Sequence, residues 1–199
     1  TGAKGVMDFR RMRFDDAVGS NGNPLFRCLP ASASTPALYT GSVVRMDGIE
    51  AIGTYANGVF GWNGTALAGV TVDGTVYVQN VYMQGDGNAT PLSYSGLFTT
   101  VDTASVTAGA NAELHVSNVT YNGTPNIPIA RIPTGMEASS SYTFTNVLAP
   151  AGSWYIGSTE YATLALFAVA KTVGLSTCRE LVDGDLDDAG RPKVEIKYT

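Results

Sequence analysis

The sequence predicts a nearly all-β protein, and three observations support this fold class. Hydrophobic residues make up 44% of the 199 residues and charged residues only 15%, a balance typical of a folded chain. The chain contains 23 glycines, and Asn-Gly or Asp-Gly dipeptides recur along it. Short runs of β-branched or alternating apolar residues lie between these dipeptides, which favours strands joined by tight turns.

The first 36 residues are less regular than the rest, and we interpret them as an extended N-terminal arm with the first strands. Arginines and aromatic residues are interleaved in the segment MDFRRMRF. Clustered guanidinium groups make multidentate contacts to anions, so this segment is our candidate for binding an acidic protein surface. A solvated edge strand is the open alternative. The candidate partner-binding residues are Phe9, Arg10, Arg11, Arg13 and Phe14.

Strands are predicted wherever β-branched or alternating runs occur. These runs are Ser42 to Met46, Thr65 to Val72, Thr75 to Met83, Ala112 to Tyr121, Ser141 to Val147 and Lys193 to Tyr198. Asp73-Gly74 has the chemistry of a hairpin turn, so we expect a hairpin from Val70 to Gln84. Within its second arm Val76, Val78 and Val81 are apolar, which indicates a half-buried strand with a bulge near Asn80.

Two segments of the second half are less regular. Three prolines between Gly123 and Ala138 exclude a central strand there and indicate an edge strand or a crossing loop. The apolar run from Tyr161 to Thr172 fits a buried strand or the one short helix of the chain, and we favour the strand.

Together these elements predict a small β-barrel or β-sandwich built from hairpins. Residues 1–36 would form the arm and first strands, and residues 37–122 a barrel-like unit. Residues 123–199 would form a second β-unit or complete the same domain. A loose recurrence of Leu67 to Val78 at Leu166 to Cys178 is the one sign of repetition.

The charge balance bears on which partners the chain takes. A net charge of −5 and an isoelectric point near 4.7 disfavour general binding to nucleic acids or to membrane surfaces. No apolar run approaches the roughly 18 residues that a membrane-spanning helix needs.

Cys28 and Cys178 lack the spacing of a zinc or redox motif, and either two thiols or one long-range disulfide is compatible with the sequence.

Two features have the residue types of a site but lack the rest of a motif. Asp183, Asp185, Asp187 and Asp188 begin like a calcium loop, yet Asp188 and Val194 stand where an EF-hand needs Gly and Glu. We expect an acidic turn, with a cation site as the alternative. His115, the single histidine, should share a polar strand face with Glu113 and Ser117. No nucleophile elbow accompanies it, so we predict no enzyme, catalytic residue, metal or cofactor.

Trp62 and Trp154 are candidates for a sugar-stacking platform, because an aromatic ring suits the apolar face of a pyranose. Packing in the core is the competing interpretation. The tryptophans therefore leave a carbohydrate-binding module open.

The order of MDFRRMRF, PLFRCLPASASTPALYTGSVVRMDG and LAGVTVDGTVYV resembles capsid decoration (cement) proteins of tailed bacteriophages. The phrase ALYTGSVVRMDG from Ala37 to Gly48 and the later Gly69-Val70 are the main similarity, which covers residues 5 to about 100. The resemblance implies a structural virion protein that is made in the host cytoplasm and binds across neighbouring subunits of the major capsid protein, often as a homotrimer. A receptor-binding or carbohydrate-binding β-module is the alternative function.

Overall fold

The computed structural model describes residues 5–14, 26–28, 38–52, 60–62, 70–85, 106–123, 130–132, 141–149, 154–156, 159–161, 174–188 and 193. These residues form β-strands and one short 3-10 helix, η2 (Asp183–Asp185). None of the described ranges holds a helix long and apolar enough to cross a membrane.

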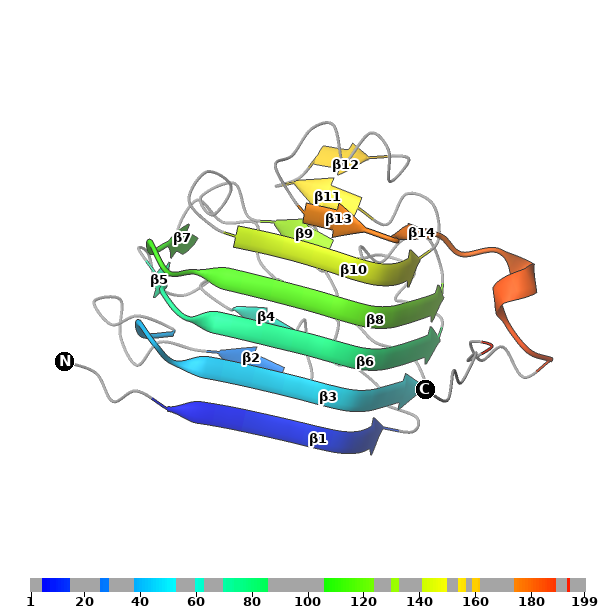
Figure 1. Cartoon of the computed structure of the whole chain (residues 1–199), viewed down its shortest axis with the longest axis horizontal. Helices are drawn as coiled ribbons and strands as arrows, with labels where there is room; N and C mark the ends of the chain where they lie inside the picture. Colours follow the sequence, from blue (N-terminus) through cyan, green and yellow to red (C-terminus); the bar gives the residue numbers. More distant parts are fainter. Residues whose placement is uncertain are drawn as a thin grey trace.

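The largest sheet, here called the main sheet, is entirely parallel (Figure 1). Its strands follow one another in chain order, and β14 pairs with β10 beyond the end of β13. Its strands are β1 (Val6–Phe14), β3 (Val43–Ile52), β6 (Thr75–Gly85), β8 (Glu113–Gly123), β10 (Ser141–Ala149), β13 (Gly174–Ser176) and β14 (Arg179–Glu180).

The register shows how far the chain travels between neighbouring strands. Val43 pairs with Thr75, Thr75 with Glu113, and Glu113 with Ser141, which are steps of 32, 38 and 28 residues. Parallel neighbours need a crossover of at least a dozen residues, which is usually a helix in α/β proteins. The described parts of these crossovers contain short strands instead.

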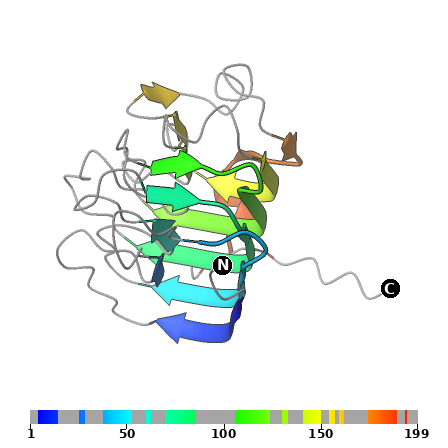
Figure 2. The same cartoon turned by 90° about the vertical axis from the view of Figure 1, so that its left-hand side faces the viewer.

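These short strands also pair with one another from one crossover to the next. The parallel pairs are β2 (Phe26–Cys28) with β4 (Phe60–Trp62), β5 (Val70–Val72) with β7 (Val106–Ala108), and β9 (Ala130–Ile132) with β11 (Trp154–Ile156). Each coil of the chain therefore stacks on the previous coil through more than one sheet, as Figures 1 and 2 show. We describe this architecture as a parallel β-solenoid, in which each coil contacts its neighbours.

The core is built from apolar columns that run across the main sheet. Met46, Val78, Val116 and Phe144 occupy equivalent positions in the register, and each is at most 1% exposed. Because one side chain of every strand enters each column, the core is continuous from coil to coil. Burial of such columns is the main stabilising contribution to the sheet.

A residue with a left-handed backbone bends each long strand at the same place in the register. Gly48, Asn80, Asn118 and Asn146 have φ angles between 52° and 69°. The extra residue shifts the inward alternation, so Val76 and Val78 before the bend and Val81 and Met83 after it are all buried. The bulge predicted near Asn80 is instead a bend that all these strands share, because β6 pairs with β3 and β8 residue for residue on both sides of Asn80.

The bend residues are joined by a ladder of side-chain amides. Asn80 Nδ2 donates to Asp47 Oδ1 at 2.7 Å, Asn118 Nδ2 to Asn80 Oδ1 at 3.2 Å, and Asn146 Nδ2 to Asn118 Oδ1 at 3.0 Å. Asparagine tolerates the left-handed region better than most residues, and its amide both donates and accepts. The ladder therefore aligns four neighbouring strands.

The strands themselves were predicted correctly at β3, β6, β8 and β10, and in part at β5. The predicted barrel or sandwich of hairpins is wrong, because the main sheet is parallel throughout. Val6–Phe14 is the first strand of this sheet, so the open alternative of an edge strand describes it and the extended arm does not. Of the run from Tyr161 to Thr172 only Tyr161 lies within the described residues, and of Lys193 to Tyr198 only Lys193.

The predicted hairpin from Val70 to Gln84 is also wrong. β5 pairs with β7, and β6 pairs with β3 and β8, so the two arms do not pair with each other. Asp73-Gly74 forms a corner between them, and a Cβ at Gly74 would lie 2.6 Å from Leu38 Cγ and 2.7 Å from Ser42 O. Close approach of neighbouring coils, and not a hairpin turn, explains this glycine.

One antiparallel pair occurs within the described residues, between β11 and β12 (Thr159–Tyr161). Ile156 pairs with Thr159, so only two residues, Gly157 and Ser158, separate this pair in the sequence. The third member of this small sheet, β9, lies at its edge, as the prolines around it predicted.

Candidate functional site

The predicted partner-binding residues all lie on β1, but they divide between its two faces. Phe9 pairs in register with the buried Met46, so it points toward the core, and Phe14 occupies the corresponding inward position after the bend. Arg10 and Arg13 point outward. Arg11 is the bend residue, with a φ angle of 53°.

The apolar columns are less covered at β1 than in the interior strands. Met7 is 44% exposed, whereas its neighbours in the same column, Val44 and Val76, are 1% and 0% exposed. Phe9, Met12 and Phe14 are half-buried. Within the described residues, part of the apolar surface of the core is therefore in contact with solvent at β1.

The outward side of β1 is positively charged. Arg10 binds Asp8 with two hydrogen bonds, of 2.9 Å from Nε and 2.6 Å from Nη2, which lower the pKa of Asp8. Arg13 Nη1 lies 3.1 Å from Glu50 Oε2 on β3. β1 carries three arginines and one aspartate in nine residues, while the whole chain has a net charge of −5.

β1 is also an edge of the main sheet (Figure 1). Among the described residues it pairs with β3 alone, from Val6 to Phe14. An edge strand presents a row of backbone N–H and C=O groups toward a further strand. The uncovered core, the basic outer side and this edge together define what we call the β1 end.

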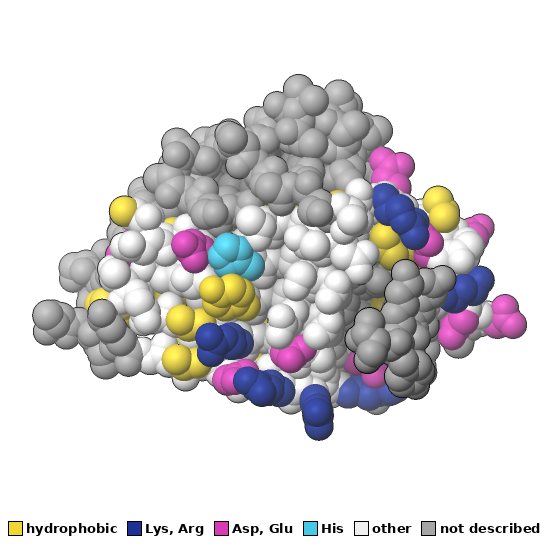
Figure 3. Space-filling model, viewed as in Figure 1, with side chains coloured by type: hydrophobic (Ala, Val, Ile, Leu, Met, Phe, Trp, Pro, Cys, Tyr) yellow, Lys and Arg dark blue, Asp and Glu magenta, His cyan; other side chains and the backbone are white. Residues whose placement is uncertain are grey.

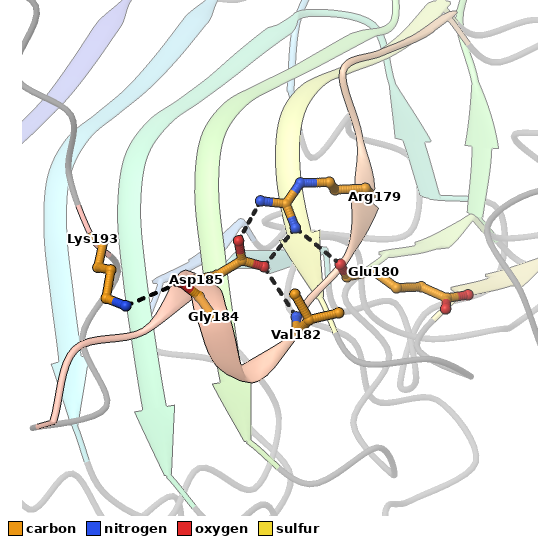
Figure 4. A network of polar contacts seen from close by, with 6 residues as sticks. All are labelled: Arg179, Glu180, Val182, Gly184, Asp185 and Lys193. Atoms are coloured by element: carbon orange, nitrogen blue, oxygen red, sulfur yellow. Dashed lines mark hydrogen bonds and ion pairs between the residues drawn. The ribbon is translucent and has the colours of Figure 1, made fainter.

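The acidic turn that the sequence predicts is formed by η2, which follows β14 along the chain (Figure 4). Arg179 binds both carboxylate oxygens of Asp185, and the Val182 N–H donates to Asp185 Oδ2 at 3.0 Å. These contacts, led by Arg179, lower the pKa of Asp185 to about 2. Lys193 closes the turn, because its backbone N–H donates to Asp185 O at 2.8 Å.

The alternative of a cation site at this turn gains no support from the geometry. Both oxygens of Asp185 are engaged by Arg179. Across the ranges that the structure describes, no three His, Cys, Asp or Glu side chains are grouped so that they could hold a metal ion.

His115 lies where the sequence places it, on the polar face of β8. Leu114 and Val116 on either side of it are buried, while the side chain of His115 is 29% exposed. Its Nδ1 is 2.7 Å from Thr143 Oγ1, and its Nε2 is 3.3 Å from Glu113 Oε2. No nucleophile elbow was found near it in the sequence, and its contacts fix the orientation of the ring.

Other predicted residues are placed only in part. Trp62 ends β4 and Trp154 begins β11, and their side chains lie outside the described part of the structure, as does that of Cys28 in β2. Cys178 carries a thiol whose Sγ donates to Phe144 O at 3.2 Å, so it forms no disulfide with Cys28.

Sequence reasoning missed the outward row that surrounds His115, formed by Arg45, Tyr77 and Thr143 on neighbouring strands. The recurring tripeptides Gln79-Asn80-Val81, Ser117-Asn118-Val119 and Thr145-Asn146-Val147 would have aligned these strands and revealed the row.

No family model matches the chain, and no curated protein or solved structure is significantly similar to it.

Proposed function

We propose that this chain is a structural protein that associates with a protein partner through the β1 end. The observation that carries the proposal is the uncovered core at β1, where Met7 is 44% exposed in a column that is otherwise buried. A strand of the partner, added in parallel to β1, would continue the apolar columns and pair the edge backbone. Strand addition of this kind is a common mode of protein recognition.

The charges of β1 indicate which partners fit. Three arginines lie on the strand, and only one aspartate accompanies them. An acidic outer face on the added strand would place carboxylates opposite these guanidinium groups, as cross-strand pairs of opposite charge favour. Charges at the rim of an interface mainly set orientation and association rate, so binding should weaken as the salt concentration rises.

The partner we propose is the major capsid protein, at the outer surface of an assembled phage capsid. The support for this is the resemblance of residues 5 to about 100 to decoration proteins, together with a surface suited to protein docking. The barrel or sandwich that the sequence predicted is not retained, because the main sheet is parallel. A homotrimer, which the resemblance also implies, is part of the same proposal.

Co-sedimentation with assembled tailed-phage capsids tests the proposal. We expect the purified chain to pellet with the capsids, and Met7→Lys to prevent this because a charge on the core side of an edge strand opposes strand addition. Val182→Lys is the matched control, since Val182 is an exposed apolar residue at the other end of the sheet. It should pellet like the unmodified chain.

Light scattering of the purified chain at low and high salt supplies a second readout. A discrete trimer supports the proposal, and a monomer contradicts its oligomeric part. Failure of the unmodified chain to bind capsids, or equal binding by Met7→Lys, would overturn docking through the β1 end. Circular dichroism of both variants verifies that they are folded.

A further inference from the structure

A second surface feature lies on the outward face of the main sheet, away from its edges. Arg45, Tyr77, His115 and Thr143 occupy equivalent positions on β3, β6, β8 and β10. With neighbouring strands about 4.8 Å apart, this row extends over about 14 Å. Figure 3 shows this face, with the histidine in cyan next to acidic and hydrophobic side chains and a basic side chain beyond the hydrophobic ones.

The side chains of the row contact one another in sequence. The guanidinium carbon of Arg45 lies 5.8 Å from the centre of the Tyr77 ring, and the rings of Tyr77 and His115 stack at 5.0 Å with an interplanar angle of 19°. Because Arg45 and His115 come from strands on opposite sides of β6, they cover both faces of the Tyr77 ring. A sugar therefore cannot stack on Tyr77, and polar groups remain to meet a ligand.

Hydrogen bonds hold the second half of the row in place. His115 is bound by Thr143 on one side and by Glu113 on the other, and Thr75 Oγ1 donates to the same Glu113 oxygen at 3.1 Å. The row is thus ordered before any ligand arrives, which reduces the entropy cost of binding.

Two groups of the row have unused hydrogen-bonding capacity. Within the described residues neither the Arg45 guanidinium nor the Tyr77 hydroxyl makes a hydrogen bond or ion pair with the protein. Arg10 and Arg179, by contrast, are each paired with an aspartate. Asp8 lies opposite Arg45 in the register, but both of its oxygens are bound by Arg10.

We infer that this row is a binding site for a saccharide that carries a carboxylate. The planar guanidinium of Arg45 matches a carboxylate, and the hydroxyls of Tyr77 and Thr143 suit sugar hydroxyl groups. The carboxylates of Glu113 and Asp47 flank the row, so it suits widely spaced carboxylates, at most one on each sugar residue, better than a dense polyanion. This site is separate from the β1 end and does not depend on the proposed function.

An acidic peptide is the competing ligand, and the topology argues against it. β3, β6 and β8 each have a paired neighbour on both sides, so their backbone groups are already used in the sheet. An extended peptide could not add a strand here and would depend on side-chain contacts alone.

The single histidine gives this site its own spectroscopic reporter. We expect trigalacturonic acid to shift the His115 ring signals in NMR titrations, and its fully methyl-esterified form, which lacks the charge, to bind at least about tenfold more weakly. Arg45→Gln should remove this preference, and Tyr77→Phe should weaken binding severalfold. Arg13→Gln, which alters a guanidinium paired with Glu50, is the matched control and should bind normally.

Absence of any shift with trigalacturonic acid would overturn the inference, and equal binding of the methyl ester would overturn the role of the carboxylate. Equal or tighter binding of triaspartate would assign the row to acidic peptides instead. Met7→Lys should bind trigalacturonic acid normally, so failure of the proposed docking function and failure of this inference are distinguishable.

Discussion

The two ends of the main sheet differ in how they terminate the solenoid. At one end β1 is nine residues long and pairs with β3 along its whole length. At the other end β13 and β14 have only three and two residues, and Thr177 and Cys178 interrupt them. The chain then leaves the sheet and folds into the turn closed by Arg179 and Asp185.

This difference determines which end can accept another strand. Short, interrupted edges protect a sheet from further pairing, whereas a long regular edge is a template for it. The core follows the same pattern, since Phe144 on β10 is 0% exposed while Phe9, in the same column on β1, is half-buried. Within the described residues, β1 is therefore the better template for an added strand.

The largest expected effect on stability comes from removing a phenylalanine from one core column, on β10 and on β1 in turn. Phe144→Ala should lower the free energy of unfolding by about 3–5 kcal/mol, because it leaves a cavity in a fully buried site. Phe9→Ala should cost only about 1–2 kcal/mol, since its side chain already contacts solvent. Urea unfolding of the two variants measures this difference. Equal losses would show that the core is as closed at β1 as at β10.

A smaller loss of stability is expected when one asparagine is removed from the middle of the bend ladder. Asn118→Ala removes hydrogen bonds to Asn80 and Asn146 and places alanine at a φ angle of 52°. We expect a loss of about 1–2 kcal/mol in unfolding free energy. Asn118→Gly keeps the backbone accessible and removes only the amide, so it should cost less. If the two variants were equally stable, the left-handed backbone would contribute nothing.

The strands could be predicted from the sequence, but their pairing could not. Alternation and β-branched residues located β6 and β8 because these signals are local. Asp73-Gly74 predicts a hairpin turn, and Asp47-Gly48 has the same turn chemistry, yet positive φ angles and small residues serve equally at a bend within a strand or at a corner between coils. Local turn chemistry does not distinguish these uses, and the difference decides the fold.

The repeat was hidden for a related reason. Successive coils differ in length, so the Asn-Val pairs at 80, 118 and 146 recur at unequal intervals and no fixed period appears. The outward row was missed for the same reason, because the pairing of Arg45 with Tyr77 can be predicted only when the strand register is known. His115 and the arginines of β1 were identified as single residues from their local pattern, which needs no register.

The bend ladder stops one strand short of the β1 end, and extending it would sharpen the contrast between the ends. Arg11 stands at the bend of β1, where the interior strands have Gly48 or asparagine. Arg11→Asn should raise the free energy of unfolding by about 0.5–1 kcal/mol, because asparagine tolerates the left-handed region better. Thermal unfolding of this variant, with Arg10→Asn as the control at an extended position, measures the gain. An unchanged or lower stability would contradict it.

The smallest expected effect concerns the closed C-terminal end and appears as a dependence on pH. The pKa of Asp185 is lowered from 3.8 to about 2 by Arg179 and the Val182 N–H. A carboxylate with a depressed pKa in the folded state stabilises the protein above its unfolded pKa, and this contribution disappears as the pH falls through the folded pKa. The contribution of Asp185 should therefore be complete above about pH 4 and lost toward pH 2.

Asp185→Asn isolates this contribution, because it keeps the shape of the side chain and removes its charge. The difference in urea midpoint between the unmodified chain and this variant should be small and constant near neutral pH, since the Arg179 side chain is 52% exposed and ion pairs open to solvent contribute little. It should shrink between about pH 4 and pH 2. Arg179→Gln should show the same loss of pH dependence, because it removes the other half of the contact. A difference that persisted to pH 2 would mean that the turn is held by its backbone hydrogen bonds and Lys193, and that the charge of Asp185 is incidental to closing this end.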